Sequence, residues 1–315
     1  IRFATPDEEI AWMDAVHGRI SWQGRDLDDF IILRSDGSAI YNLAVVSDDG
    51  ALIAPTPGHE LVVSTDLLVE GTHFFPDTNP EDLGWKTLAV NVSDLAAMGA
   101  EPRWAFLALA LPAVDEAWIE AFARGLFACA DAFGVDLAGG DTTRGPLNLA
   151  LTIIGEVPQG EAITRAGARA GEDLWVSGQP GRAALGLAAL RAELSLNAAA
   201  RHECLAALQR PQPRSALGQA LRGLASAMLD VSDGLLGDLA HILERSHVGA
   251  VLDAPSLPLA ALLATGAPPG SARHCLLSGG DDYELLFTAA PGARATLGAL
   301  GARLGVALHR IGFIT

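Results

Sequence analysis

The sequence predicts an α/β protein built from two mixed halves, each with its own sheet and helices. Short apolar runs rich in β-branched residues alternate with segments whose apolar residues recur at helical spacing. At 315 residues the chain is long enough for two domains, since single cores stop growing at about 250 to 300 residues. Acidic stretches recur in both halves, most of them at the end of an apolar run: Ser47-Asp48-Asp49, Ser64-Thr65-Asp66, Asn91-Val92-Ser93-Asp94, Gly139-Gly140-Asp141 and Asp230-Val231-Ser232-Asp233.

The elements expected in the first half follow from apolar spacing, turn residues and helix caps. Asp36-Gly37 is a hairpin signal, Asp115 fits an N-cap, and Asp94 falls within a helical period. In chain order we expect strands at 30–34, 39–46 and 60–64, a helix at 80–98, a strand at 104–111, a helix at 115–133 and a strand at 147–157.

Glycine, alanine and arginine dominate residues 160–171, so we place a domain boundary there, between domains at 47–165 and 166–315. In the second domain we expect a strand at 173–177, helices after Gly181 and around Leu205, a strand into Asp230, a helix at 235–246, strands near Val251 and at 283–288, a helix at 293–304 and a last strand near Ile311.

The composition of the chain limits the partners and the cellular location that can be expected for it. The net charge of −17, without a basic stripe, speaks against a nucleic-acid partner. No stretch approaches 18 consecutive apolar residues, and no basic region precedes an apolar signal core, so we expect a cytoplasmic protein without a membrane partner. Three widely separated cysteines outside any Cys-x-x-Cys pattern indicate reduced thiols.

Lys86 is the only lysine, and it follows Trp85 rather than a glycine, which excludes a Walker-type phosphate loop. Protein-kinase signatures are absent as well. A nucleotide would therefore be held by metals, arginines and backbone amides. Gathered carboxylates repel one another unless a hard cation such as Mg²⁺ neutralises them, so the acidic stretches indicate a site for a metal-bound polyphosphate.

Each of these residues also has an ordinary structural interpretation. Taken alone, Asp66 and Asp233 fit a helix cap or a turn better than a metal site. Arg165 fits an exposed arginine, and His73 fits a hydrogen-bonded core histidine. Asp94 is the exception, because a carboxylate on an otherwise apolar helix favours metal binding.

Seven ordered blocks over 47–315 carry a family resemblance. They include Ser64-Thr65-Asp66-Leu67-Leu68-Val69-Glu70-Gly71-Thr72-His73, Asn91-Val92-Ser93-Asp94, Gly139-Gly140-Asp141-Thr142-Thr143-Arg144, Asp230-Val231-Ser232-Asp233-Gly234 and Ser278-Gly279-Gly280-Asp281-Asp282-Tyr283. The chain resembles the thiamine-monophosphate kinases, members of the aminoimidazole ribonucleotide synthetase-like superfamily. The resemblance implies that superfamily's two-domain fold, with the dimer contact and the metal and ATP site in the N-terminal domain and an α/β C-terminal domain.

The resemblance also implies the chemistry. Such enzymes phosphorylate thiamine monophosphate to thiamine diphosphate with ATP and several Mg²⁺ ions, as cytosolic homodimers and without a protein nucleophile. Residues matching metal positions are Asp49, Ser64, Thr65, Asp66, Asp94, Asp141, Asp230 and Asp233. Residues matching nucleotide contacts are Gly140, Asp141, Arg165 and Ser232. His73 and Asp281 match positions on the substrate side.

The chain departs from the family pattern at three places. Val45-Val46-Ser47 stands where a Gly-x-Gly turn is usual, Asp281 stands where a glutamate is usual, and the sequence ends at Thr315 without the aromatic-rich tail that family members carry. Residues 1–46 instead resemble an internal stretch of bacterial glutamyl-tRNA synthetase, which suggests a fused head without synthetase motifs. Two other functions remain open: a sibling ATP-using enzyme such as the cyclising purine-pathway synthetase, or a non-catalytic nucleotide-binding chimera.

Overall fold

The structure is a computed structural model that describes residues 2–3, 9–14, 18–23, 30–31 and 51–315. Contacts divide the chain into one unit of residues 1–53 with 137–140 and a second unit of 54–136 with 141–315. In the first unit, antiparallel pairs join β2 (Glu9–Asp14) to β3 (Gly18–Gln23) and β1 (Arg2–Phe3) to β4 (Phe30–Ile31). The hairpin expected around Asp36-Gly37 and the acidic stretch at Asp48-Asp49 lie outside the described residues.

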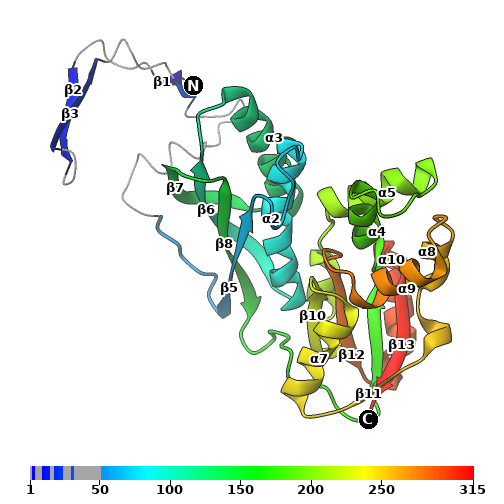
Figure 1. Ribbon diagram of the computed structural model, residues 1–315. Helices are drawn as coiled ribbons and strands as arrows, with labels where there is room; N and C mark the ends of the chain where they lie inside the picture. Colours follow the sequence, from blue (N-terminus) through cyan, green and yellow to red (C-terminus); the bar gives the residue numbers. More distant parts are fainter. Residues whose placement is uncertain (1, 4–8, 15–17, 24–29, 32–50) are drawn as a thin grey trace. The chain divides into compact units, whose positions relative to one another are not determined.

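A four-stranded sheet carries two of the five acidic stretches, at 64–66 and 139–141. Its strand order is β5-β8-β6-β7, and the β5/β8 and β6/β8 pairs are antiparallel. Two helices, α2 and α3, lie along one face of this sheet (Figure 1). The bounds are β5 His59–Val69, α2 Pro80–Ala97, β6 Glu101–Leu111, α3 Glu116–Phe133, β7 Asp136–Arg144 and β8 Asn148–Pro158.

Two acidic stretches expected at strand ends lie inside strands, so that expectation is wrong for them. Ser64-Thr65-Asp66 lies within β5, because the β-forming residues Leu67, Leu68 and Val69 continue the strand. Asp141 likewise lies within β7, whereas Asp230 is next to last in its strand, as expected. Alternation along β5 puts Ser64 and Asp66 on the face of buried Val62 and Leu68, and Thr65 on the opposite face.

The helix expected at 80–98 is confirmed as α2. The Asn79 side chain accepts a hydrogen bond from the Glu81 amide, and Pro80 occupies the first turn, so the sequence starts the helix here. Almost every α2 residue from Leu83 to Ala97 is buried, including polar residues such as Lys86, Asn91 and Ser93, so the helix is packed on nearly all sides. Helix α3 begins at its predicted cap, since Asp115 accepts from the Trp118 amide. These helices form the core against which the sheet packs.

Two glycines let α2 and α3 approach each other closely. A Cβ added to Gly84 would lie 2.0 Å from the Phe122 carbonyl oxygen, and one added to Gly125 would lie 1.7 Å from the Glu81 carbonyl oxygen. Both neighbouring atoms belong to the backbone, so a side chain would force the helices apart.

We therefore expect Gly125→Ala to destabilise the protein by about 2 kcal/mol or more, although alanine is the better helix former. The matched control is Gly298→Ala in a later helix, where an added Cβ meets nothing within 4 Å. That change should leave stability unchanged or raise it by up to about 1 kcal/mol. Urea denaturation of both variants measures the difference, and equal stability of the two would contradict the close helix contact.

A five-stranded antiparallel sheet forms the remainder of the second unit, in the order β10-β12-β9-β13-β11. Its strands are β9 Asp173–Ser177, β10 Ala225–Val231, β11 Ala250–Leu252, β12 Glu284–Ala289 and β13 Leu308–Ile314. The helices are α4 Arg182–Leu190, α5 Ala198–Gln209, α6 Ser215–Ala220, α7 Leu235–Ser246, α8 Leu259–Leu263, α9 Pro269–Ser278 and α10 Arg294–Leu304. All strands expected here are confirmed, whereas α6, α8 and α9 were not predicted. Among the described residues, no helix combines the length and apolar character needed to cross a bilayer.

Candidate active site

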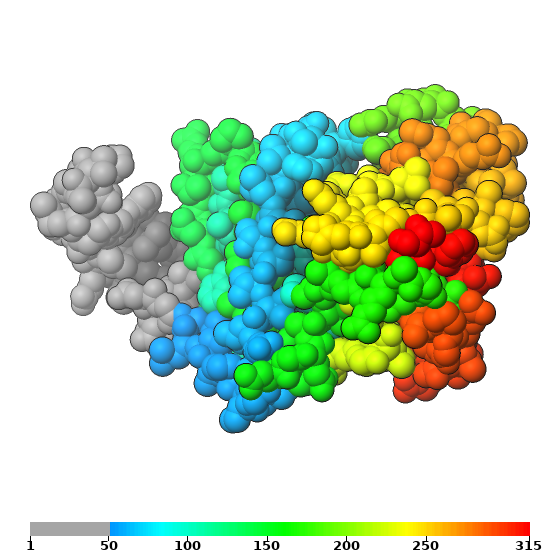
Figure 2. Space-filling model, turned by 90° about the horizontal axis from the view of Figure 1, so that it is seen from below, coloured from blue at the N-terminus to red at the C-terminus, as the bar shows by residue number. Residues whose placement is uncertain are grey.

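A cavity of about 440 Å³ gathers residues from β5, α2, the 163–166 segment, β10 and α7. Its walls are largely apolar, with Val62, Met98 and Ile163 among them. Ser64, Asp94 and Asp230 supply its acidic and hydroxyl groups, while Arg165 and Arg245 supply positive charge. On the face drawn in Figure 2, the blue segment after residue 50, the green segment near 160–170 and the yellow segment near 240 meet.

Two neighbouring residues of α2 connect the strands on either side of it. The Ser64 hydroxyl of β5 donates a hydrogen bond of 2.5 Å to Asp94 Oδ2. The Ser93 hydroxyl donates one of 2.6 Å to Asp230 Oδ2 of β10. Consecutive helical residues point about 100° apart, so Ser93 and Asp94 can reach different strands. Helix α2 thereby brings together acidic stretches that lie far apart in the sequence.

Three carboxyl groups in this region have raised pKa values and therefore ionise less readily than usual. Burial, and then the charge of Asp94, raise the pKa of Asp66 to about 6. Burial and Asp94 also raise the pKa of Asp230 to about 7, against the hydrogen bond from Ser93. The pKa of Asp94 is itself raised by burial, although Ser64 and Arg165 oppose the shift. Burial of carboxylates and the repulsion from Asp94 are conditions that a bound cation relieves.

The donor atoms suit Mg²⁺, which prefers carboxylate and hydroxyl oxygens. Within residues 51–315, no group of three or more His, Cys, Asp or Glu side chains is close enough to hold a metal by itself. Mg²⁺ is usually held by one or two carboxylates together with substrate phosphates, so pairs of the present kind fit a metal that arrives with a polyphosphate. Asp66, Asp94 and Asp230 are the residues that would hold it.

These pKa shifts predict how stability depends on pH and on metal. The folded protein binds protons at Asp66 and Asp230 more tightly than the unfolded chain does, since both values lie above the ordinary 3.8. Their contribution to stability is complete below 3.8 and is lost as the pH rises through about 6 and about 7.

Without divalent cations, the Tm should therefore fall between about pH 5 and about pH 8, and Mg²⁺ should restore more of it at the higher pH. Differential scanning fluorimetry in EDTA and in Mg²⁺ measures both effects. An equal effect of Mg²⁺ at the two pH values would contradict the assignment, and an Asp66→Asn, Asp230→Asn variant should lose most of the difference.

The loop after β10 is fixed by a residue that the sequence did not indicate. Asp238 Oδ2, in the first turn of α7, accepts hydrogen bonds from the amides of Ser232, Asp233 and Gly234 at 3.0 to 3.1 Å. Gly234 has a φ of 117°, a conformation that favours glycine. Ser232 is therefore held in a defined place, and the exposed Asp233 points from a rigid loop. An acidic residue four positions into a predicted helix was the available signal.

Other predicted site residues are not brought to this cavity by any described contact. Thr65 is exposed and bonds Thr152 through its hydroxyl, on the face opposite Ser64 and Asp66. Asp141 is exposed and accepts from the Thr142 amide. His73 is exposed, and its Nδ1 accepts from the Val69 amide. Gly140 lies in β7 with a φ of 144° and belongs to the first unit. Asp49 lies outside the described residues.

Asp281 lines a separate cavity of about 410 Å³ together with Ser232 and Asp233. Its Oδ2 accepts from Lys86 Nζ at 3.1 Å and its Oδ1 from the Tyr283 hydroxyl at 2.9 Å. Sequence reasoning gave Lys86 no role, and its status as the sole lysine was the signal that could have singled it out.

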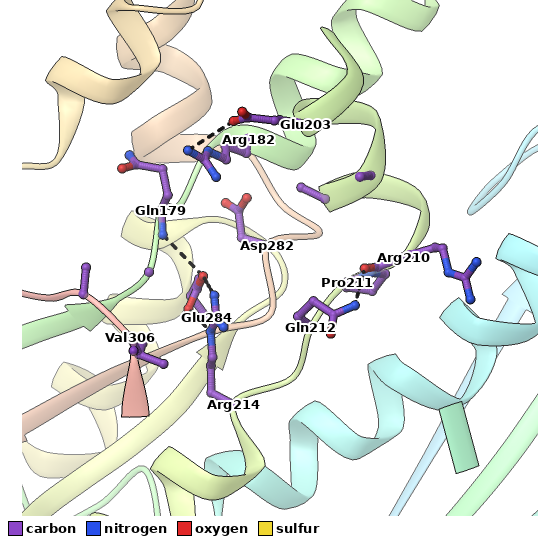
Figure 3. A pocket seen from close by; sticks show the side chains of 15 residues that line it. Gln179, Arg182, Glu203, Arg210, Pro211, Gln212, Arg214, Asp282, Glu284 and Val306 are labelled. Atoms are coloured by element: carbon purple, nitrogen blue, oxygen red, sulfur yellow. Dashed lines mark hydrogen bonds and ion pairs between the residues drawn. The ribbon is translucent and has the colours of Figure 1, made fainter. Parts of the chain in front are cut away.

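The largest cavity described, about 670 Å³, lies beside the segment between α5 and α6 (Figure 3). Arginines line it, but each already faces a carboxylate. Arg214 makes a two-fold contact with Glu284 at 2.6 and 2.7 Å, and Arg182 lies 3.5 Å from Glu203. Arg210 lies 3.5 Å from Asp82. These charges are compensated, so this cavity is a weaker candidate for an anionic ligand than the one around Asp94.

Comparison with known protein families and structures identifies the family to which this fold belongs. A family model described as the N-terminal domain of AIR synthase related proteins matches residues 47–157, and the corresponding C-terminal domain model matches residues 169–315. The first 46 residues, where a synthetase-like head was inferred, lie outside both matches. The two sheets with their helices are thus the two domains of an AIR synthase-related protein.

Individual relatives narrow the family further. The thiamine-monophosphate kinase of Escherichia coli K12 is 47% identical over 271 residues, which cover 86% of this chain and 83% of the relative. A crystal structure of the Stenotrophomonas maltophilia K279a thiamine-monophosphate kinase superposes with a TM-score of 0.81 at 48% identity, covering 86% of this chain and 87% of that one. AaThiL in complex with AMPPCP and TMP gives a TM-score of 0.72 at 29% identity over 83% and 82% of the two chains. The chain belongs to the thiamine-monophosphate kinase family and is an enzyme of the kinase class.

Proposed function

We propose that the protein transfers the γ-phosphoryl group of Mg²⁺-bound ATP to the phosphate of thiamine monophosphate, giving thiamine diphosphate and ADP. In this reaction a phosphate oxygen of thiamine monophosphate forms a bond to the γ-phosphorus, and the bond from that phosphorus to the ADP oxygen breaks. The observation that carries the proposal is the cavity lined by Asp94, Asp230 and Arg165, where burial and the charge of Asp94 raise the pKa of Asp230 and also that of Asp66.

The chain's own residues contribute positioning and charge. Ser64 and Ser93 orient the carboxylates of Asp94 and Asp230 through their hydrogen bonds. Arg165 and Arg245 lie at the same cavity and can meet the phosphates of a nucleotide. Apolar walls from Val62, Met98 and Ile163 reduce the local dielectric, which strengthens these charge interactions. When bound, Mg²⁺ neutralises phosphate charge and brings the reacting groups into line.

The proposed site also includes four residues that rest on the family resemblance alone: Asp49, Thr65, Asp141 and Gly140. Thr65 would have to contribute through its main chain, because its hydroxyl bonds Thr152 on the opposite face of β5. Asp233 and Ser232 lie on the loop fixed by Asp238, between the Asp230 end of β10 and the cavity at Asp281. His73 and Asp281 remain the proposed substrate contacts.

A product-resolved assay tests this function. The purified protein is incubated with thiamine monophosphate, ATP and Mg²⁺, and thiamine diphosphate and ADP are quantified by chromatography. Equal amounts of both products, absent in EDTA, are expected. ADP formed without thiamine diphosphate would contradict the proposal and would indicate a different acceptor.

We also propose that the protein is a homodimer that uses the exposed face of the β5 sheet. Leu61, Val63 and Leu67 are 44, 59 and 50% exposed on alternate positions of this edge strand. A second copy would cover these apolar side chains, whose exposure in one row is otherwise unfavourable. Light scattering should give twice the chain mass for the wild type and the single-chain mass for Val63→Lys. A monomeric wild type would contradict this arrangement.

A further inference from the structure

Lys86 occupies an unusual position for a lysine. It is the only lysine among 21 lysines and arginines, and it is 5% exposed on α2. A buried ammonium group requires a counter-charge, and the Asp281 carboxylate, 195 residues later, provides one at 3.1 Å. Arginine serves everywhere else in the chain, but its planar fork is bulkier than a compact ammonium on a flexible stem. The position of Lys86 therefore requires a compact ammonium group, whereas arginine serves at every other basic position of the chain.

The helix that carries Lys86 is firmly attached to the second half of the chain. The adjacent Trp85 donates its indole N–H to the Pro211 carbonyl at 2.8 Å, and the Arg210 guanidinium lies 4.9 Å from the centre of its ring. Two consecutive residues of α2 thus contact two different segments of the second half. The helix therefore holds the backbone of Lys86 in place, and the Lys86 side chain reaches Asp281 from that fixed backbone position.

The backbone around Asp281 is held independently of Lys86. Asp281 and Tyr283 have φ values of 65° and 53°, in the left-handed region that residues other than glycine rarely adopt, so the surrounding contacts must hold this backbone in place. The Asp281 amide donates to the Ser232 carbonyl at 2.8 Å. Asp282 accepts from the Gly181 amide at 2.6 Å, and Glu284 is clamped by Arg214 (Figure 3). Loss of Lys86 would therefore leave the Asp281 side chain held by Tyr283 alone, without unfolding its loop.

The Asp281 carboxylate uses one oxygen for Lys86 and the other for Tyr283, and its side chain remains 35% exposed. An ionised carboxylate has about four lone-pair positions, so two remain for a ligand in the cavity shared with Ser232 and Asp233. We propose that Lys86 is a positioning residue that, with Tyr283, holds Asp281 in the orientation that receives thiamine monophosphate. The inference rests on the proposed function, because it takes Asp281 as a substrate contact.

The sole lysine allows a direct test that does not require turnover. In protein labelled with [13Cε]lysine and carrying no lysine-containing tag, one NMR signal reports Lys86. Asp281→Asn should shift this signal, and so should thiamine monophosphate added to the wild type. Arg103→Met, which removes a half-buried arginine paired with Glu101 and Glu156 on β6 and β8, is the control and should leave the signal unchanged.

Kinetics of a double-mutant cycle provide the second readout. Lys86→Met should raise the KM for thiamine monophosphate about tenfold and leave the KM for ATP within about twofold, because only the substrate contact is misplaced. Lys86→Met combined with Asp281→Asn should be no worse than Asp281→Asn alone. Tyr283→Phe should raise the same KM in the same direction, while Arg103→Met should change neither.

The outcomes separate this inference from the proposed function. An active wild type whose KM for thiamine monophosphate is unaffected by Lys86→Met would overturn the positioning role, as would additive losses in the cycle. If the NMR signal of Lys86 does not change in Asp281→Asn, the positioning role is overturned even where the enzyme is inactive. If the wild type proves inactive, the dissociation constant of thiamine monophosphate replaces KM, and an unchanged constant in Lys86→Met overturns the inference.

Discussion

Asp94→Asn is expected to lower kcat by at least about a hundredfold while the fold is retained. Asp94 is the carboxylate whose charge reaches both Asp66 and Asp230, and it is oriented by the Ser64 hydroxyl. Asparagine keeps the shape and can still accept that hydrogen bond, but it removes the charge that would bind a cation. Steady-state kinetics with thiamine monophosphate and ATP measure the effect.

Glu116→Gln provides the control for Asp94→Asn, because it removes a carboxylate from the exposed start of α3 and should leave kcat unchanged. Circular dichroism and Tm confirm that Asp94→Asn remains folded. A folded variant with a kcat near that of the wild type would remove Asp94 from the metal assignment.

Asp230→Asn should have opposite effects on stability and on activity. The Asp230 side chain is buried, and burial together with Asp94 raises its pKa to about 7. At about pH 8 the folded protein must therefore ionise a group that its surroundings disfavour, and asparagine relieves this cost. The Ser93 hydroxyl can donate to the asparagine carbonyl as it does to Asp230. Without metal, the variant should be more stable than the wild type.

The same substitution should lower kcat by about a hundredfold or more, since a group proposed to hold Mg²⁺ loses its charge. Tm in EDTA and kcat in Mg²⁺ are measured on one preparation, with Ser93→Ala as a variant that removes the hydrogen bond but keeps the carboxylate. A Tm below that of the wild type together with full activity would contradict the account. Ser93→Ala should retain most of the activity.

The sequence predicted the parts of the fold that local pattern controls. The apolar period of α2, the Asp115 cap of α3 and the strand at 173–177 all follow from neighbouring residues, and the structure confirms them. The end of β5 was misplaced because polar Ser64-Thr65-Asp66 looked like a strand end, whereas pairing with β8 continues the strand to Val69. Helix α6, with six residues, is too short for its period to be recognised.

The resemblance identified most candidate site residues but could not give their partners. The contact of Ser93 with Asp230 spans 137 residues, and that of Lys86 with Asp281 spans 195, so no local spacing encodes either. Asp238 was missed for a different reason: its partners lie only four to six residues away, but only the folded loop directs three amides at one carboxylate. The backbone of Asp281 is left-handed, and the presence of an aspartate in the sequence does not predict this conformation.

The most direct test of the site is a crystal structure with Mn²⁺ replacing Mg²⁺ and a non-hydrolysable ATP analogue bound. Anomalous scattering locates each Mn²⁺ ion without ambiguity. At least one Mn²⁺ is expected within coordination distance of Asp94 and of Asp66 or Asp230, bridged to the analogue's phosphates, and no such ion is expected in Asp94→Asn. A bound analogue whose Mn²⁺ ions avoid all three carboxylates would contradict this expectation.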